Sequence, residues 1–154
     1  TRRVYVLSDM RKYDVPLLGM GFLKKKSFAK IRARFHSAME GGNWDAPGYK
    51  KTAKHVSEIA AAKEIEGTIL VTGTCQEAQI RRFVQALNAA AKSEKFAYAE
   101  SVTTSAQIFK KIRENDAPVL LVEMLGDSLK DNIAYEISEL KKQDADILGM
   151  LVFE

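Results

Sequence analysis

The stretch that decides the fold is Gly67-Thr68-Ile69-Leu70-Val71-Thr72-Gly73-Thr74-Cys75-Gln76-Glu77. Residues 69–71 form a short apolar run with β-branched members, which is typical of a strand covered on both faces. Apolar residues then recur at helical spacing, so residues 78–92 are predicted to form an amphipathic helix whose inward face carries Ile80, Phe83, Val84 and Leu87. A buried strand, a loop and a helix in this order hold phosphate groups in many α/β proteins.

The loop itself lacks the residues that bind phosphate. A loop of the pattern G-x-x-x-x-G-K-[ST] supplies backbone N–H groups, a lysine for the β- and γ-phosphates and a hydroxyl for magnesium. Here Gly73 is the only glycine of the loop, and Ile80 and Arg81 stand near the expected Gly-Lys-Ser. Glu77 adds negative charge where phosphates would bind. The sequence therefore predicts a degenerate phosphate loop made of Gly73, Thr74, Cys75, Gln76 and Glu77.

On both sides of this stretch, predicted strands alternate with predicted helices. This alternation predicts a doubly wound α/β fold with a mainly parallel sheet and helices on both faces. The strands are expected at 4–7, 17–20, 96–100, 118–122 and 147–153, and the helices at 8–13, 28–39, 49–63, 104–114 and after an N-cap at Asp127-Ser128. Residues 40–48, rich in glycine and proline, are predicted to be a loop.

Length and composition favour one folded domain. The chain has 154 residues, of which 46% are hydrophobic and 29% charged, values that exclude an intrinsically disordered chain. We expect a single domain over 1–154, with a leading segment (1–48) and a core (49–154). One cysteine excludes an internal disulfide and favours a reducing compartment. The net charge of +4 and the lack of a recognised motif predict no nucleic-acid partner.

Three stretches resemble one protein family. Residues 3–19, RVYVLSDMRKYDVPLLG, resemble a segment of the polysaccharide chain-length determinants and the related bacterial tyrosine kinases. In that family the segment follows the second transmembrane helix and enters the cytoplasmic domain. Residues 67–72 resemble the strand that opens the family's phosphate loop, and residues 119–154 resemble its last strand, helix and strand. The resemblance implies a domain like a P-loop NTPase.

The catalytic signatures of the resembling kinases are missing. Residues 97–102 replace the expected acidic strand, no D-x-P-P follows, and no tyrosine cluster ends the chain. We therefore expect no catalytic residue, no cofactor and no metal. Glu123 and Asp127 close a strand as metal-binding carboxylates often do, but without a phosphate loop they are interpreted as solvated loop and N-cap residues.

Two charged surfaces and one thiol are candidate sites. A basic helix face is predicted either to rest on anionic lipid or to be merely solvated, and comprises Lys24, Lys25, Lys26, Lys30, Arg32 and Arg34. A mixed-charge face is predicted either to contact a partner subunit or to be solvated, and comprises Lys50, Lys51, Lys54 and Glu58. Cys75 is either a thiol whose pKa a helix N-terminus lowers or a small apolar residue.

The resemblance implies a non-catalytic cytoplasmic domain for interaction and assembly, in a membrane protein that regulates the chain length and export of an extracellular or capsular polysaccharide. It would lie at the cytoplasmic face of the bacterial plasma membrane. Its partners would be the membrane portion of its parent chain, a polysaccharide polymerase or tyrosine kinase, and further copies of itself. Since the chain opens at Thr1 without an initiator methionine, we expect an excised piece. The alternative is an atypical nucleotide-dependent kinase or phosphotransferase that uses Thr74, Cys75 and Glu77.

Overall fold

The structure, a computed structural model, describes residues 12–21 and 47–153. In these ranges strands and helices alternate, as the sequence predicts. The strands are β1 (Leu17–Gly21), β2 (Ile69–Thr72), β3 (Phe96–Tyr98), β4 (Val119–Met124) and β5 (Ile147–Phe153), and the helices are α2 (Pro47–Ala62), α3 (Glu77–Ala91), α4 (Gln107–Asn115) and α5 (Lys130–Lys142). The strand expected at 4–7, most of the helix expected at 8–13 and the basic helix expected at 28–39 lie outside the described residues.

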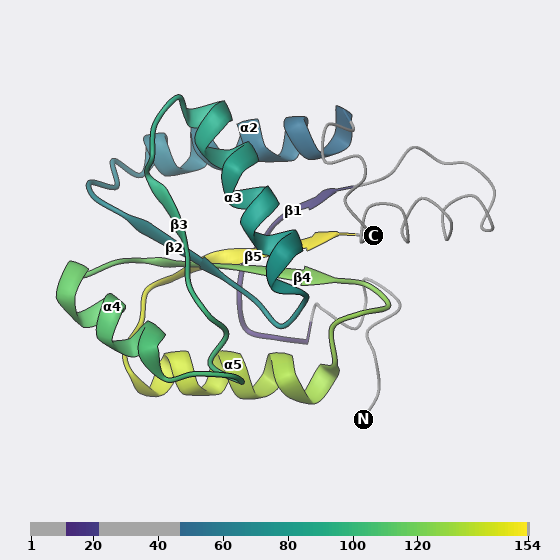
Figure 1. Cartoon of the computed structure of the whole chain (residues 1–154), viewed down its shortest axis with the longest axis vertical. Helices are drawn as coiled ribbons and strands as arrows, with labels where there is room; N and C mark the ends of the chain where they lie inside the picture. Colours follow the sequence, from purple (N-terminus) through teal and green to yellow (C-terminus); the bar gives the residue numbers. More distant parts are fainter. Residues whose placement is uncertain (1–11, 22–46, 154) are drawn as a thin grey trace.

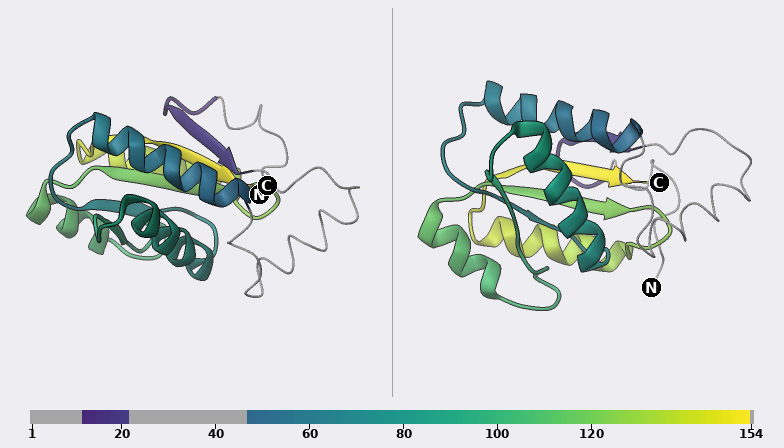
Figure 2. Two further views of the ribbon diagram at one scale, coloured as in Figure 1. Left: turned by 90° about the horizontal axis from the view of Figure 1, so that it is seen from above. Right: turned by 45° about the horizontal axis from the view of Figure 1, so that its top comes forward.

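The five strands form one parallel sheet with the order β1-β5-β4-β2-β3 (Figure 1). β3 pairs with one side of β2, and the next strand, β4, pairs with the other side. The direction of winding therefore reverses after β3. Right-handed crossovers then require α2 and α3 to cover one face of the sheet and α4 and α5 to cover the opposite face. Figure 1 and the right-hand view of Figure 2 show this arrangement. The predicted doubly wound α/β fold is confirmed.

Each face of the sheet has its own apolar core. The inward residues of α2 and α3 pack on β2, β4 and β5, and Phe83 meets Phe153 edge to face with ring centroids 4.8 Å apart. On the other face, Ile108 and Ile112 of α4 and the inward residues of α5 pack on the same strands. The inward positions predicted for the helix after β2 are confirmed, because Ile80, Phe83, Val84 and Leu87 are all buried.

The two edge strands are built differently. At β3, the side chain of Asn88 accepts a hydrogen bond from the Phe96 N–H at 2.8 Å and donates one to the Phe96 carbonyl at 2.9 Å. At the other edge, β1 comes from the leading segment and pairs with β5, the last strand. Gly149 permits this pairing, since a Cβ atom there would lie 2.7 Å from the Pro16 carbonyl oxygen.

Several expected boundaries differ from the structure, since β3 ends at Tyr98 instead of residue 100 and α4 begins at Gln107 instead of residue 104. Helix α2 begins at Pro47, inside the predicted loop, because proline fits the first turn of a helix, where no N–H is needed. Helix α5 begins at Lys130 after Leu129, and no side chain caps it, so the predicted N-cap at Asp127-Ser128 is wrong. Strand β4 continues to Met124, and Glu123 is 0% exposed. The interpretation of Glu123 as a solvated loop residue is therefore wrong.

Candidate functional site

A polar cluster lies at the carboxyl ends of β2 and β4, where the strand order reverses. Doubly wound sheets usually bind their ligands at this position. Thr72 of β2 pairs with Leu121 of β4, and side chains alternate along both strands. Since Leu70 and Leu121 belong to the core beneath α4 and α5, Thr72 and Glu123 point to the same face. The cluster therefore lies at the end of that core nearest the carboxyl ends of β2 and β4.

Glu123 is the centre of the cluster. Its carboxylate accepts hydrogen bonds from the Thr74 N–H at 3.1 and 3.2 Å and from the Thr74 hydroxyl at 2.5 Å. The Ser128 hydroxyl donates a further bond at 2.7 Å while accepting one from the Met124 N–H at 3.0 Å. Thr74 lies in the loop after β2 and Ser128 in the loop after β4. One carboxylate thus joins both loops of the reversal point.

A second buried carboxyl group, Glu136 of α5, lies near enough to Glu123 for each to influence the pKa of the other. Both side chains are 0% exposed. Burial raises the pKa of Glu136 well above its ordinary value, and the Glu123 carboxylate raises it further. Burial also raises the pKa of Glu123, although the hydrogen bonds from Glu136, Thr74 and Ser128 oppose that rise. The upward shift of the pKa is therefore larger for Glu136 than for Glu123. The Ser101 hydroxyl donates to the Glu136 carboxyl group at 3.5 Å.

The loop after β2 lies against β4. A Cβ atom on Gly73 would stand 1.8 Å from the Val122 carbonyl oxygen, so only glycine fits there. The Cys75 thiol is 8% exposed and contacts the same carbonyl oxygen at 3.5 Å. Burial and the charge of Glu123 raise the pKa of Cys75 well above its usual value. The expectation that a helix N-terminus lowers this pKa is wrong, because desolvation outweighs it.

The remaining loop residues point to solvent. Gln76 and Glu77 are exposed, and Glu77 accepts a hydrogen bond from the Arg81 guanidinium at 2.7 Å, forming an ion pair instead of facing a ligand. The Arg81 guanidinium also lies over the Tyr98 ring, 4.2 Å from its centroid. Of the five predicted loop residues, the structure brings Gly73, Thr74 and Cys75 together against β4 and leaves Gln76 and Glu77 outside.

Several buried polar atoms of the described residues have no hydrogen-bond partner within the chain. They include the Thr72 hydroxyl, one Asp127 carboxylate oxygen, one Glu136 carboxyl oxygen and the whole amide of Gln79 on α3. Gln79 is 1% exposed. Helical spacing gave no reason to expect a buried amide there, because only the apolar positions of that helix carry a periodic signal.

The two predicted charged surfaces have different outcomes. Lys50, Lys51, Lys54 and Glu58 are all exposed on α2, and their role in assembly stays a prediction. The basic residues between Lys24 and Arg34 lie outside the described residues.

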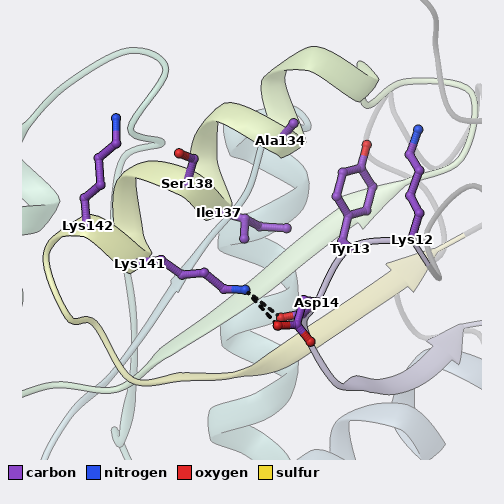
Figure 3. A pocket seen from close by; sticks show the side chains of 8 residues that line it. All are labelled: Lys12, Tyr13, Asp14, Ala134, Ile137, Ser138, Lys141 and Lys142. Atoms are coloured by element: carbon purple, nitrogen blue, oxygen red, sulfur yellow. Dashed lines mark hydrogen bonds and ion pairs between the residues drawn. The ribbon is translucent and has the colours of Figure 1, made fainter.

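An open groove lies beside α5 (Figure 3). Its volume is about 590 Å³, and residues 12–14 line one side of it and α5 the other. The ammonium of Lys141 crosses it to the backbone carbonyl of Asp14 at 2.9 Å and to its carboxylate at 3.5 Å. The Tyr13 hydroxyl donates to the Lys130 carbonyl at 3.0 Å. These contacts fasten the segment before β1 to α5.

Sequence reasoning missed Glu123 and Glu136 as a pair. They lie 13 positions apart in the sequence, on either side of the β4–α5 turn, and each carboxylate taken alone is typical of a surface residue. The signal that could have found Glu123 was the apolar run that continues on both sides of it in Val119–Met124.

Comparison with known proteins adds no family assignment. No protein-family model matches the chain, and no curated protein sequence matches it significantly. The class that the fold and the site define is a doubly wound α/β domain with a buried carboxyl pair at its strand-order reversal. Among the residues that the structure describes, no group of three or more His, Cys, Asp or Glu side chains is arranged to hold a metal ion. In residues 12–21 and 47–153, no helix has the length and hydropathy needed to span a membrane.

Proposed function

We propose that this chain is a non-catalytic interaction and assembly domain at the cytoplasmic face of the bacterial plasma membrane. It would belong to a membrane protein that regulates the chain length and export of an extracellular or capsular polysaccharide. The family resemblance of residues 3–19, 67–72 and 119–154 supports the biological setting. The partners would be the membrane portion of the parent chain, a polysaccharide polymerase or tyrosine kinase, and further copies of this domain.

One observation carries the non-catalytic part of the proposal. In the loop after β2, the N–H and the hydroxyl of Thr74 both donate to the carboxylate of Glu123. In a phosphate loop, such donors face the negatively charged oxygens of the nucleotide. An internal carboxylate that receives these bonds competes with phosphate for the donors and repels it by charge. The Glu123 carboxylate thus occupies the donors of the loop that a phosphate group would need.

The enzyme alternative receives no support from the same residues. A kinase or phosphotransferase built on Thr74, Cys75 and Glu77 would need these groups to face a substrate. The Thr74 hydroxyl donates to Glu123, the Cys75 thiol is buried, and Glu77 pairs with Arg81. A buried thiol with a raised pKa is a poor nucleophile.

Isothermal titration of the chain with Mg-ATP tests the proposal. We expect no binding at micromolar concentrations, because the phosphates would lack both a lysine and a free hydroxyl. Micromolar affinity for Mg-ATP would overturn the non-catalytic assignment. The variant Glu123→Ala, checked for folding by circular dichroism, shows whether the carboxylate is the obstacle. If inorganic phosphate binds that variant and not the wild type, Glu123 blocks the loop.

A further inference from the structure

The fold buries two neighbouring carboxyl groups that cannot both be ionised at low cost. Glu123 of β4 and Glu136 of α5 are both 0% exposed, and each is among the main influences on the pKa of the other. Ser128 donates a hydrogen bond to the first and Ser101 to the second. One of these carboxyl groups can donate to the other only when it carries a proton, because two ionised carboxylates only accept hydrogen bonds. Two adjacent charges away from water would also repel strongly. The arrangement is therefore stable only while one of the two groups is protonated.

The described groups around the pair do not supply a compensating charge. The loop after β2 contributes Thr74 and Cys75, and the turn after β4 contributes Asp127 and Ser128. Ser101, after β3, donates to Glu136. The titratable members of this shell, Cys75 and Asp127, are acids, and no cation of the described residues is among the main influences on the pKa of Glu123 or Glu136. A neutralising proton is the remaining way to remove the repulsion.

The Glu123 side chain links the protonation of the carboxyl pair to the loop after β2. Glu123 holds Thr74 by its N–H and its hydroxyl, so any displacement of the Glu123 side chain breaks the hydrogen bonds that hold the loop after β2. We propose that one proton shared by Glu123 and Glu136 locks this loop, and that loss of the proton at rising pH releases the loop from the end of the sheet. The lock is a pH-sensitive switch that goes beyond the proposed function and does not depend on a partner.

The sign of the pH dependence follows from the pair. The pKa of Glu136 is raised above 4.5, its ordinary value, so the folded protein keeps a proton that the unfolded chain releases. The contribution of this proton to the free energy of unfolding is fully present below the pKa that Glu136 has in the unfolded chain. It is lost as the pH rises through the higher pKa that Glu136 has in the folded protein. For one proton, the unfolding equilibrium constant increases by up to about tenfold for each pH unit in this window.

Urea denaturation of the full chain between about pH 5 and about pH 8 tests the proposal. This window lies below the region where the Cys75 thiol, with an ordinary pKa of 9.0, begins to ionise. We expect the unfolding constant of the wild type to rise through the window and that of Glu136→Gln to stay nearly level, because the amide donates to Glu123 at every pH. Glu139→Gln, on the same helix and paired with Lys142 at 2.8 Å, is the matched control and should behave as the wild type does.

A second measurement reports the loop itself. Hydrogen exchange at the Thr74 amide, compared between wild type and Glu136→Gln at each pH, should show protection that declines only in the wild type. Equal pH dependence in the two proteins would overturn the lock. If Glu136→Gln does not fold, carbon-13 NMR of glutamate-labelled wild type decides. One carboxyl signal that stays protonated near about pH 7 supports the proposal, and titration of all glutamates near their ordinary pKa overturns it.

Discussion

Gly73 is the residue at which the loop after β2 passes against the backbone of β4. A methyl group in its place would stand 1.8 Å from the Val122 carbonyl oxygen and 2.9 Å from its carbon, both backbone atoms of a central strand. The strand lies inside the sheet between β2 and β5 and has no room to withdraw. The position of the loop depends on the absence of a side chain at Gly73. The hydrogen bonds from Thr74 to Glu123 depend on it in turn.

We predict that Gly73→Ala lowers the free energy of unfolding by about 2 to 4 kcal/mol, because the clash forces backbone to move. Gly67→Ala is the control, since Gly67 has φ +83° but a methyl group added there would have nothing within 4 Å. The control should lose only about 1 kcal/mol through backbone strain. Urea denaturation measures both, and equal losses would mean that the clash relaxes without cost.

The thiol of Cys75 should be unreactive in the folded protein. It is 8% exposed, and burial beside Glu123 raises its pKa, so the reactive thiolate is scarce and covered. We predict that iodoacetamide modifies it at least about a hundredfold more slowly in buffer than in denaturing urea. In the variant that carries Cys75→Ser and Gln76→Cys, the thiol moves to an exposed neighbour and should react rapidly. Similar rates for the two folded proteins would contradict the buried position.

Among the elements, β3 has an edge protected by one side chain. The Asn88 amide makes both of its hydrogen bonds with the N–H and carbonyl of Phe96, as a neighbouring strand would. An edge strand with free backbone groups is a template for pairing with other chains. Helix α3 therefore protects the edge of the strand that follows it.

We predict that Asn88→Ala destabilises the fold by about 1 to 3 kcal/mol, since two part-buried backbone groups lose their partner. The variant should also scatter more light on gentle heating, because the β3 edge becomes open. Asn115→Ala is the control: it removes an exposed amide whose bond to the Lys111 carbonyl lies within one helix turn. Identical urea midpoints for both variants would show that Asn88 does not protect the edge.

The helices could be predicted from sequence more fully than the site. Periodic apolar residues predicted the inward face of α3, and the alternation of elements predicted the doubly wound sheet. The end of β4 could not be predicted, because a carboxylate in an apolar run is interpreted as leaving the core. What keeps Glu123 inside is contact with Thr74 and Glu136, which are 49 and 13 residues away. Such pairing exists only after folding.

On the scale of the whole molecule, the outer side of α2 is the surface proposed for assembly. Lys50, Lys51, Lys54 and Glu58 are exposed there. Mixed charges of this kind guide association more than they hold it, so contact between separate copies should be weak. A scaffold that gathers several copies raises their effective concentration and should reveal the contact.

We predict a chain that sediments as a monomer at micromolar concentration and associates further when it is fused to a trimeric scaffold. Changing Lys50, Lys51 and Lys54 to Glu should abolish the scaffold-dependent association. The control reverses Lys110, Lys111 and Arg113, which are exposed on α4 across the sheet. If the α2 and α4 variants sediment alike, α2 is not the assembly surface.

The pairing of β1 with β5 also determines how the domain resists mechanical force. The two strands are parallel neighbours from opposite ends of the described chain. Tension applied at Lys12 and at Phe153 pulls them in opposite directions along their length, so their hydrogen bonds are sheared together. Tension applied at Gly21 and Phe153 instead opens the bonds one after another from the carboxyl ends. The domain pulled at Lys12 and Phe153 should therefore rupture at a higher force than the same domain pulled at Gly21 and Phe153.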